Sequence, residues 1–304
     1  MAGITKTTIH VLTVHFNTPE LTVDLVKGFP TSSPAGSRIE VHILDNFSSA
    51  DNLQALQDGI SGLSNVRFEA NDKNVGFGVG VNILARADYI KDDDTIWVLN
   101  PDTRLDADCL ANLEEALDRT EYDIVSPLIY SGTSADRRVW YCGGSIKTSS
   151  MRIQHQLYDE DLAAAPLQPF DTEFVTGAAP MMRASTFRTV GGFPSNYFLY
   201  WEDTLFSWRA RELKFRLGVV PAAMLWHAVG ASSGHGQSPT FYYWYARNRF
   251  IFSSDIGFPR WRLIAGSGAV QSLRFIAKAL REPEGRFRKM KEAVRGTFAG
   301  ITHK

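Results

Sequence analysis

The chain has 304 residues, 44% of them hydrophobic, and a formal net charge of −1. It is long enough to bury a sizeable core, and its near-neutral charge argues against nucleic acid as the default partner. The two cysteines, Cys109 and Cys142, give neither a disulfide framework nor a metal-ligand spacing, which fits a reducing compartment.

Strand-like and helix-like segments alternate through the first hundred residues. Apolar, β-branched runs predict strands over 9–15, 40–44, 66–69 and 95–99. Apolar residues at helical spacing predict helices over 20–29, 51–60 and 78–90. This alternation is typical of an α/β fold with a parallel sheet and helices on both faces.

The middle of the chain is less regular. Helices are predicted over 107–118, 184–190 and 203–212, and strands over 124–129, 214–220 and 224–227. Turn residues indicate a hairpin around 139–146, and the Gly/Ser-rich stretch 231–240 indicates a flexible loop.

A basic segment closes the chain. Residues 258–304 hold eleven Lys or Arg against three acids, a net charge of +8. Apolar and basic residues recur there at helical spacing, which fits a helix on an anionic lipid surface. A helix packed on the body with a solvated basic face explains the pattern equally well. With no signal-peptide pattern and no long apolar window, we expect a cytoplasmic protein, soluble or peripheral at the inner face of the plasma membrane.

The strongest motif is Asn100-Pro101-Asp102, directly after the strand predicted over 95–99. Open α/β sheets bind ligands at the carboxyl ends of their strands, and a carboxylate there can hold a divalent ion against a diphosphate. The same residues also form an ordinary type I turn. His227 would add a nitrogen ligand, and such a mixed set suits Mn²⁺ better than Mg²⁺; a lone histidine is also often structural.

Two neighbouring acids, Glu202 and Asp203, follow an aromatic run over 197–201. Aromatic surroundings exclude water and raise the pKa of a carboxylate, as a general base requires. Alternatively, the two acids stabilise the start of a helix through its dipole, a role that explains one acid more readily than two.

Three further segments are compatible with a nucleotide ligand. Asp45 follows a strand and could accept a hydrogen bond from a base or a ribose, or form a simple Asx turn. The Gly-rich stretch 74–82 opens a helix but lacks both the dinucleotide fingerprint and the P-loop spacing. Arg247 could bind phosphate oxygens, or lie on an interfacial amphipathic helix.

Taken in order, these segments resemble the inverting family 2 glycosyltransferases with a GT-A fold, especially bacterial rhamnosyltransferase-like members. The similarity covers roughly residues 8–250 and rests on the ordered set rather than on one motif. The segments are His15-Phe16-Asn17-Thr18-Pro19, Leu44-Asp45-Asn46-Phe47-Ser48-Ser49, Asn74-Val75-Gly76-Phe77-Gly78, Leu99-Asn100-Pro101-Asp102-Thr103, Thr176-Gly177-Ala178, Val190-Gly191-Gly192-Phe193, Phe198-Leu199-Tyr200-Trp201-Glu202-Asp203, His227 and Arg247-Asn248.

The resemblance implies a Rossmann-like, mostly parallel sheet flanked by helices, with a C-terminal helical extension. The catalytic domain would span 1–257, with nucleotide-sugar binding over about 1–103 and acceptor binding and the base over 104–257, before a basic amphipathic tail over 258–304. The implied reaction moves rhamnose or another hexose from a nucleotide-diphosphate sugar to a hydroxyl of a cell-surface glycan or a lipid-linked acceptor, with Mn²⁺ or Mg²⁺ as cofactor.

The resemblance also implies residue roles. Asp203, with Glu202 beside it, would be catalytic, and Asp102 and His227 would hold the metal. The implied donor-binding residues are His15, Asn17, Asp45, Asn74, Gly76, Asn100, Asp102 and Arg247, and the implied acceptor-side residues are Gly177, Ala178 and Trp201. Two departures are Asn100, where the DxD-like motif begins with Asp, and Leu205, where many relatives carry a further acid.

The expected mechanism is a one-step displacement with inversion. The metal neutralises the leaving diphosphate, Asp203 within about 3 Å removes the acceptor proton, and the loop 231–240 closes over the donor. A sugar-phosphate nucleotidyltransferase is one alternative, but it needs a Gly-rich, Arg- and Lys-bearing loop that residues 15–19 do not provide. A non-catalytic glycan- or nucleotide-sugar-binding protein is another, which would not need base and metal ligands together.

Overall fold

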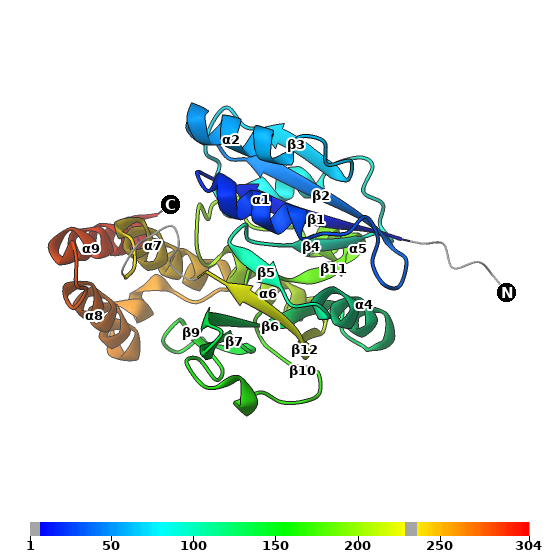
Figure 1. Ribbon diagram of the computed structural model, residues 1–304. Coiled ribbons are helices and arrows are strands. Elements are labelled where there is room, and N and C mark those ends of the chain that lie inside the picture. Colours follow the sequence, from blue (N-terminus) through cyan, green and yellow to red (C-terminus); the bar gives the residue numbers. More distant parts are fainter. Residues whose placement is uncertain (1–6, 229–235, 304) are drawn as a thin grey trace.

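A ten-stranded sheet runs through the middle of the computed structural model, which describes residues 7–228 and 236–303 (Figure 1). Four strands form its parallel first half, in the order β3-β2-β1-β4. They are β1 (Thr8–His15), β2 (Arg38–Asp45), β3 (Val66–Ala70) and β4 (Thr95–Val98). The predicted alternation of strands and helices is therefore confirmed in this half.

The second half of the sheet mixes directions. Strands β6 (Ile124–Thr133) and β12 (Leu217–His227) are parallel to each other, and β11 (Met181–Arg183) lies antiparallel between β4 and β6. Two short strands, β5 (Thr103–Leu105) and β10 (Phe170–Asp171), pair antiparallel with β12. The sequence did not predict β5, β10 or β11, because two or three residues are too few for a periodic pattern.

The predicted hairpin around 139–146 is wrong. Strand β7 (Asp136–Tyr141) pairs with β6, whereas β8 (Gly144–Lys147) pairs with β9 (Arg152–His155) in a separate two-stranded sheet. Gly143, at a φ of 84°, turns the chain between the two sheets, a conformation that favours glycine. The turn signal was correct, but it marks a corner between sheets.

Helices cover both faces of the large sheet (Figure 1). The pleat of β1 explains this, because Ile9 and Val11 face one apolar core while Leu12 and Val14 face another. Helices α1 (Pro19–Lys27), α2 (Ala50–Ile60) and α4 (Cys109–Arg119) contribute to the first core, and α3 (Phe77–Ala85), α5 (Ala184–Val190) and α6 (Glu202–Glu212) to the second.

The C-terminal region is helical, as predicted, and lies on the side of the molecule opposite the start of β1 (Figure 1). It comprises α7 (Pro239–Asp255), α8 (Gly266–Leu280) and α9 (Arg286–Thr302). Gly296 and Gly300 let α9 approach the backbone of α7 so closely that a Cβ at either position would collide with it. No helix in the described part of the chain is both long and apolar enough to cross a lipid bilayer.

Candidate active site

The turn after β4 brings Asp102 to His227. Strand β5, which follows this turn, pairs with β12 so that Thr103 lies opposite His227. The amide of Ala228 also donates a hydrogen bond to the carbonyl of Asp102. As a result, His227 Nε2 lies 3.1 Å from Asp102 Oδ1, although 125 positions separate the two residues.

These two side chains form a candidate metal site. The Asp102 side chain is 20% exposed and the His227 side chain 9%, so the carboxylate can be reached from solvent. The ring of Trp140 packs edge-on against His227, at 4.6 Å between centroids, and fixes its orientation. A carboxylate oxygen and an imidazole nitrogen that converge in this way suit a divalent ion such as Mn²⁺.

Asp203 lies in the first turn of α6, where three donors orient its carboxylate. The amide of Gly177 donates to Oδ2 at 2.9 Å, and the amide and hydroxyl of Thr204 donate to Oδ1 at 2.7 and 3.2 Å. Burial raises the pKa of Asp203, while these donors and His155 oppose the rise. Asp203 remains half-buried, so its carboxylate can meet a substrate.

Glu202 is in a different position, because it is only 5% exposed and its Oε2 has no hydrogen-bond partner among the described residues. Burial, and then the adjacent charge of Asp203, raise the pKa of Glu202 well above its usual range. Burial therefore favours the protonated form of Glu202 more strongly than that of Asp203, whose hydrogen-bond donors oppose the rise, and Asp203 is the better candidate base.

Gly177 and Ala178 connect the candidate base to the candidate metal site. Gly177 donates to Asp203, and the carbonyl of Ala178 accepts a hydrogen bond from the amide of Asn100 at 3.0 Å. Asn100 begins the turn that carries Asp102. Two consecutive residues thus hold both carboxylates at the same edge of the sheet.

The backbone before α6 is strained. Tyr200 and Trp201 both have positive φ angles, 67° and 73°, which side-chain-bearing residues rarely adopt. Asn248 of α7 stabilises this conformation by donating to the carbonyls of Leu199 and Tyr200, both at 2.9 Å. Strain of this kind is common where a catalytic residue must be held in place, and Asp203 lies two residues after Trp201.

Two other predicted features of α6 lie in the core. The ring of Trp201 is 1% exposed and packs on Tyr245 and Phe252 of α7. It therefore anchors the start of α6 to α7 and has no surface open to an acceptor. Leu205 is also 1% exposed. An acid at that position would be buried, which explains why a leucine is tolerated there.

At the carboxyl ends of β1 and β2, the side chains of His15 and Asp45 place two buried hydrogen-bond acceptors near each other. His15 Nδ1 lies 2.7 Å from the hydroxyl of Thr22, which itself donates to the carbonyl of Thr18. The Nδ1 of His15 must therefore carry the proton, which leaves Nε2 as an acceptor. It lies 3.8 Å from Asp45 Oδ1, and neither atom has a hydrogen-bond partner among the described residues.

Asn17 closes this end of the sheet. Its Oδ1 accepts hydrogen bonds from the amide of Ser49 at 2.9 Å and the side chain of Asn52 at 3.0 Å, and its amide donates to Ser48. Asn17 therefore ties the loop after β1 to the loop after β2.

The Gly-rich loop before α3 is fixed by two asparagines. Asn74 accepts from Asn46 and from the amide of Gly76, both at 3.0 Å. Gly76 has a φ of 83°, and a Cβ there would collide with the carbonyl of Phe198. The next residue, Phe77, donates to that same carbonyl at 3.1 Å. The loop is therefore locked to the segment that precedes Asp203. Asn46 was not among the predicted site residues.

Arg247 was predicted to bind the donor, but its hydrogen bonds do not link it to the other predicted donor-site residues. Its guanidinium donates to the carbonyl of Asn196 and to Asn248, and it stacks on Trp244 at 5.1 Å. These contacts stabilise the segment before α6.

The sequence interpretation missed Trp140 and His155. His155 Nδ1 lies 3.0 Å from the carbonyl of Trp140, and the two rings meet edge to face. The charge of Asp203 also acts on His155, although burial is the larger effect and lowers its pKa. Both residues lie within the irregular stretch 131–170, whose only signal was its content of aromatic and histidine residues. The predicted closing loop, 231–240, has its residues 231–235 outside the described part of the chain.

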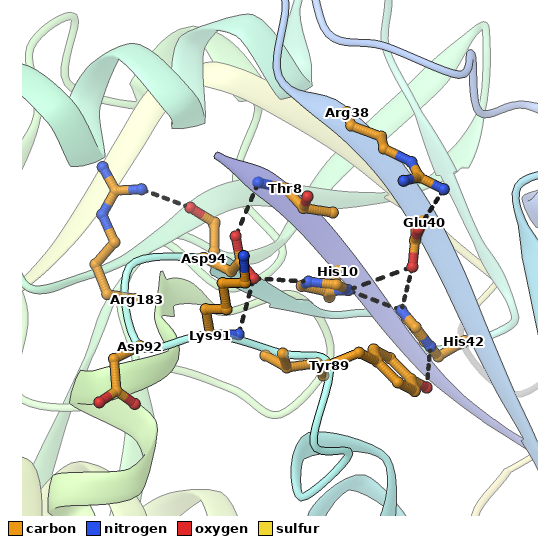
Figure 2. A network of polar contacts seen from close by, with 12 residues as sticks. Thr8, His10, Arg38, Glu40, His42, Tyr89, Lys91, Asp92, Asp94 and Arg183 are labelled. Atoms are coloured by element: carbon orange, nitrogen blue, oxygen red, sulfur yellow. Dashed lines mark hydrogen bonds and ion pairs between the residues drawn. The ribbon is translucent and has the colours of Figure 1, made fainter. Parts of the chain in front are cut away.

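A second cluster, formed by His10, Glu40 and His42, lies near the start of β1 and β2, away from the site (Figure 2). Its ligand atoms lie within 4.8 Å of one another. They already have partners, however: the two rings contact each other at 2.9 Å, and Glu40 pairs with Arg38 at 2.6 Å and Arg67 at 3.1 Å. Two guanidinium groups on the one carboxylate disfavour a cation, so we assign this cluster to stability.

Two sequence relatives and several solved structures are similar to this chain. A hexosyltransferase of low-salt glycan biosynthesis, Agl10 of Haloferax volcanii, is 24% identical over 71% of this chain and 68% of its own length. The N-acetylglucosaminyl-diphospho-decaprenol L-rhamnosyltransferase of Mycobacterium tuberculosis is 24% identical over 84% of this chain and 89% of its own length.

Three solved structures share the fold. GalNAc-T7 with UDP, GalNAc and Mn²⁺ has a TM-score of 0.63 at 16% identity; the match covers 88% of this chain but only 58% of that longer one. The mannosyltransferase PcManGT of Pyrobaculum calidifontis, with GDP-Man and Mn²⁺, has a TM-score of 0.59 at 12% identity over 99% and 89%. S. aureus TarS 1–349 with UDP-GlcNAc has a TM-score of 0.51 at 13% identity over 96% and 73%.

The family model described as glycosyl transferase family 2 matches residues 19–191, more than half of the chain. This segment contains Asp45, the Gly-rich loop, Asp102 and Gly177, whereas Asp203 and His227 lie beyond it. Together with the GT-A architecture and the named hexosyl- and rhamnosyltransferase relatives, the match shows that the chain belongs to the family 2 glycosyltransferases and is a glycosyltransferase enzyme.

Proposed function

We propose that this enzyme is a metal-dependent, inverting glycosyltransferase. It moves rhamnose or another hexose from a nucleotide-diphosphate sugar to a hydroxyl of a cell-surface glycan or a lipid-linked acceptor. The observation that carries the proposal is the link through Gly177 and Ala178, which holds Asp203 and the Asp102 turn at one edge of the sheet. The mycobacterial relative, whose name specifies a decaprenol-linked acceptor, supports that acceptor class.

In this mechanism Asp102 and His227 would hold a divalent ion, Mn²⁺ or Mg²⁺. When bound, such an ion neutralises the charge that develops on a leaving diphosphate. Asp203 accepts the proton of the acceptor hydroxyl, and its three hydrogen-bond donors keep it oriented as it does so. A single displacement from the face opposite the diphosphate inverts the anomeric centre.

The two buried acceptors of His15 and Asp45 support a nucleoside-binding role for the carboxyl ends of β1 and β2. Two buried acceptors without a donor between them cost free energy until an N–H or O–H group fills the gap. A ligand donor, such as a base N–H or a ribose hydroxyl, satisfies both at once. Asn17 supports this arrangement through its loop contacts, since its own Oδ1 is already occupied.

Replacing Asp203 with Asn tests the proposal. The amide cannot accept the acceptor proton, so turnover should fall by about 10²–10⁴-fold, while nucleotide affinity measured by calorimetry persists. Glu202→Gln is the matched control, because it removes the other carboxyl of the pair without removing the candidate base, and it should lose much less. Near-normal turnover of Asp203→Asn with manganese and a working donor would remove Asp203 from the mechanism. Thermal-shift screening of dTDP-rhamnose, UDP-galactose, UDP-galactofuranose, UDP-GlcNAc and GDP-mannose would identify that donor.

The proposal also places the enzyme in the cytoplasm, peripheral to the inner face of the plasma membrane, where a lipid-linked acceptor is available. The basic tail, with its net charge of +8, supports this location.

A further inference from the structure

Exposed apolar side chains are concentrated in the C-terminal helices. The described part of the chain has fourteen large hydrophobic residues that are exposed, and eight of them lie between positions 261 and 298. These are Trp261, Ile264, Val270, Leu273, Leu280, Phe287, Val294 and Phe298. A contiguous concentration of this kind marks a surface that meets a partner.

On α8 the exposed apolar residues form one stripe. Val270, Leu273 and Leu280 recur at spacings of three and seven, which places them on one side of a helix. Three exposed basic residues, Arg274, Lys278 and Arg281, form a parallel row beside this stripe. The buried residues Gly268 and Ala279 face the body of the protein instead.

Helix α9 repeats the arrangement. Phe287, Val294 and Phe298 recur at spacings of seven and four, and the two phenylalanines are 67% and 68% exposed. The exposed basic residues Arg288, Lys291 and Arg295 lie along one side of this stripe. The opposite side of α9, which carries the buried residues Lys289, Ala293, Gly296 and Gly300, is the side that packs.

The three acids of this region offset only part of its positive charge. Glu282 is engaged by Lys289 at 3.0 Å and by the hydroxyl of Tyr242 at 2.8 Å. Glu292 pairs with Arg295 on the same helix. Only Glu284 has no partner among the described residues of this segment. The outward faces are therefore apolar and cationic, which is the chemistry of a helix in the interface of an anionic bilayer.

We infer that the outward faces of α8 and α9 form a docking surface for anionic lipid bilayers. Phenylalanine and leucine side chains enter the headgroup region, and the arginine and lysine rows contact lipid phosphates. A second protein would instead call for a closed apolar core with few charges, whereas here every apolar stripe has a basic row beside it.

The position of this surface gives it a role. In Figure 1 the C-terminal helices lie on the side opposite the start of β1, so the carboxyl end of β1 points toward those helices. Helix α7, on which α9 packs, also holds the segment before Asp203 through Asn248. Docking therefore brings the active-site edge to the bilayer, a consequence that rests on the proposed lipid-linked acceptor.

The test is co-sedimentation of the full-length protein with two kinds of vesicle, phosphatidylcholine alone and phosphatidylcholine mixed with phosphatidylglycerol. Wild type should sediment with the mixed vesicles only. Leu273→Ser/Phe287→Ser/Phe298→Ser should reduce that binding by about tenfold or more without changing charge, and Arg274→Gln/Lys278→Gln/Arg281→Gln should reduce it and its salt dependence. All six side chains are exposed, so the fold should persist by circular dichroism.

Matched controls lie elsewhere on the surface. Leu167→Ser removes a leucine that is 89% exposed, and Arg119→Gln removes an arginine whose side chain is 77% exposed; both should bind as wild type does. Failure of wild type to bind the mixed vesicles, or equal binding by the triple variants, would overturn the inference. So would a concentration-dependent dimer in sedimentation velocity that the serine variant abolishes. Turnover with a soluble acceptor should be unchanged in both triple variants, so loss of lipid binding and failure of the proposed chemistry are separable.

Discussion

Mild acid should destabilise this protein through its buried histidines, above all His42, whose pKa is shifted most. A chain of hydrogen bonds fixes its protonation state (Figure 2). The carboxylate of Asp94 can only accept, so His10 Nε2–H donates to it at 3.2 Å, which leaves His10 Nδ1 as an acceptor. His42 Nε2–H then donates to His10 at 2.9 Å, and the hydroxyl of Tyr89 donates to His42 Nδ1 at 3.1 Å. Both rings are neutral in this arrangement, and a further proton would disrupt it.

The magnitude follows from the pKa. Burial, and then the charge of His10, lower the pKa of His42 from 6.5 to about 3. Because the folded pKa lies below the unfolded one, the unfolded chain binds more protons in acid. The stability is therefore complete above pH 6.5 and is lost as the pH falls toward 3. At pH 5, about 1.5 units below 6.5, the loss is about 2 kcal/mol.

Urea unfolding of wild type and His42→Gln between pH 7 and pH 5 measures this effect. Glutamine can donate to His10 and accept from Tyr89 without titrating, so the stability of the variant should fall by about 2 kcal/mol less than that of wild type over this range. Tyr141→Phe is the control, since it removes one hydrogen bond outside this network, to the carbonyl of Phe174, and should lower stability by about 1 kcal/mol at every pH without changing the pH dependence. Equal slopes for wild type and His42→Gln would refute the reasoning.

Two further substitutions test the backbone around the site. Gly76→Ala places a Cβ against the carbonyl of Phe198, at a φ of 83°. It should therefore lower the free energy of unfolding by about 2–4 kcal/mol and also reduce turnover. Unchanged stability in a urea titration would contradict the close approach. Phe47 has a φ of 70° and a ring that is 57% exposed, so Phe47→Gly should leave stability within about 1 kcal/mol of wild type, whereas Phe47→Val should cost about 1–2 kcal/mol more than Gly. If thermal denaturation shows Phe47→Val to be more stable than Phe47→Gly, the backbone at this position is not strained.

The main elements of the fold were predictable because their signals are local. Each parallel strand is an uninterrupted apolar run, and each flanking helix repeats its apolar residues within a few positions, so neither needs knowledge of distant partners. The pairings were not predictable in the same way. Strand β11 has three residues, and nothing in them indicates that they insert antiparallel between β4 and β6. The corner at Gly143 gives the same turn signal whether the chain closes a hairpin or changes sheet.

The sequence by itself determined that acids, a histidine and Gly-rich turns follow strands of an α/β fold, because residue type and periodicity are properties of short segments. Only the tertiary structure decided which of these side chains meet. The β5–β12 pairing brings Asp102 to His227, and the hydrogen bond from Gly177 orients Asp203. Glu202 is buried and Asp203 only half-buried, so their carboxyl groups differ in access to solvent although the two residues are adjacent in the chain. Solvent exposure and long-range hydrogen bonds arise from packing, and packing depends on the whole chain.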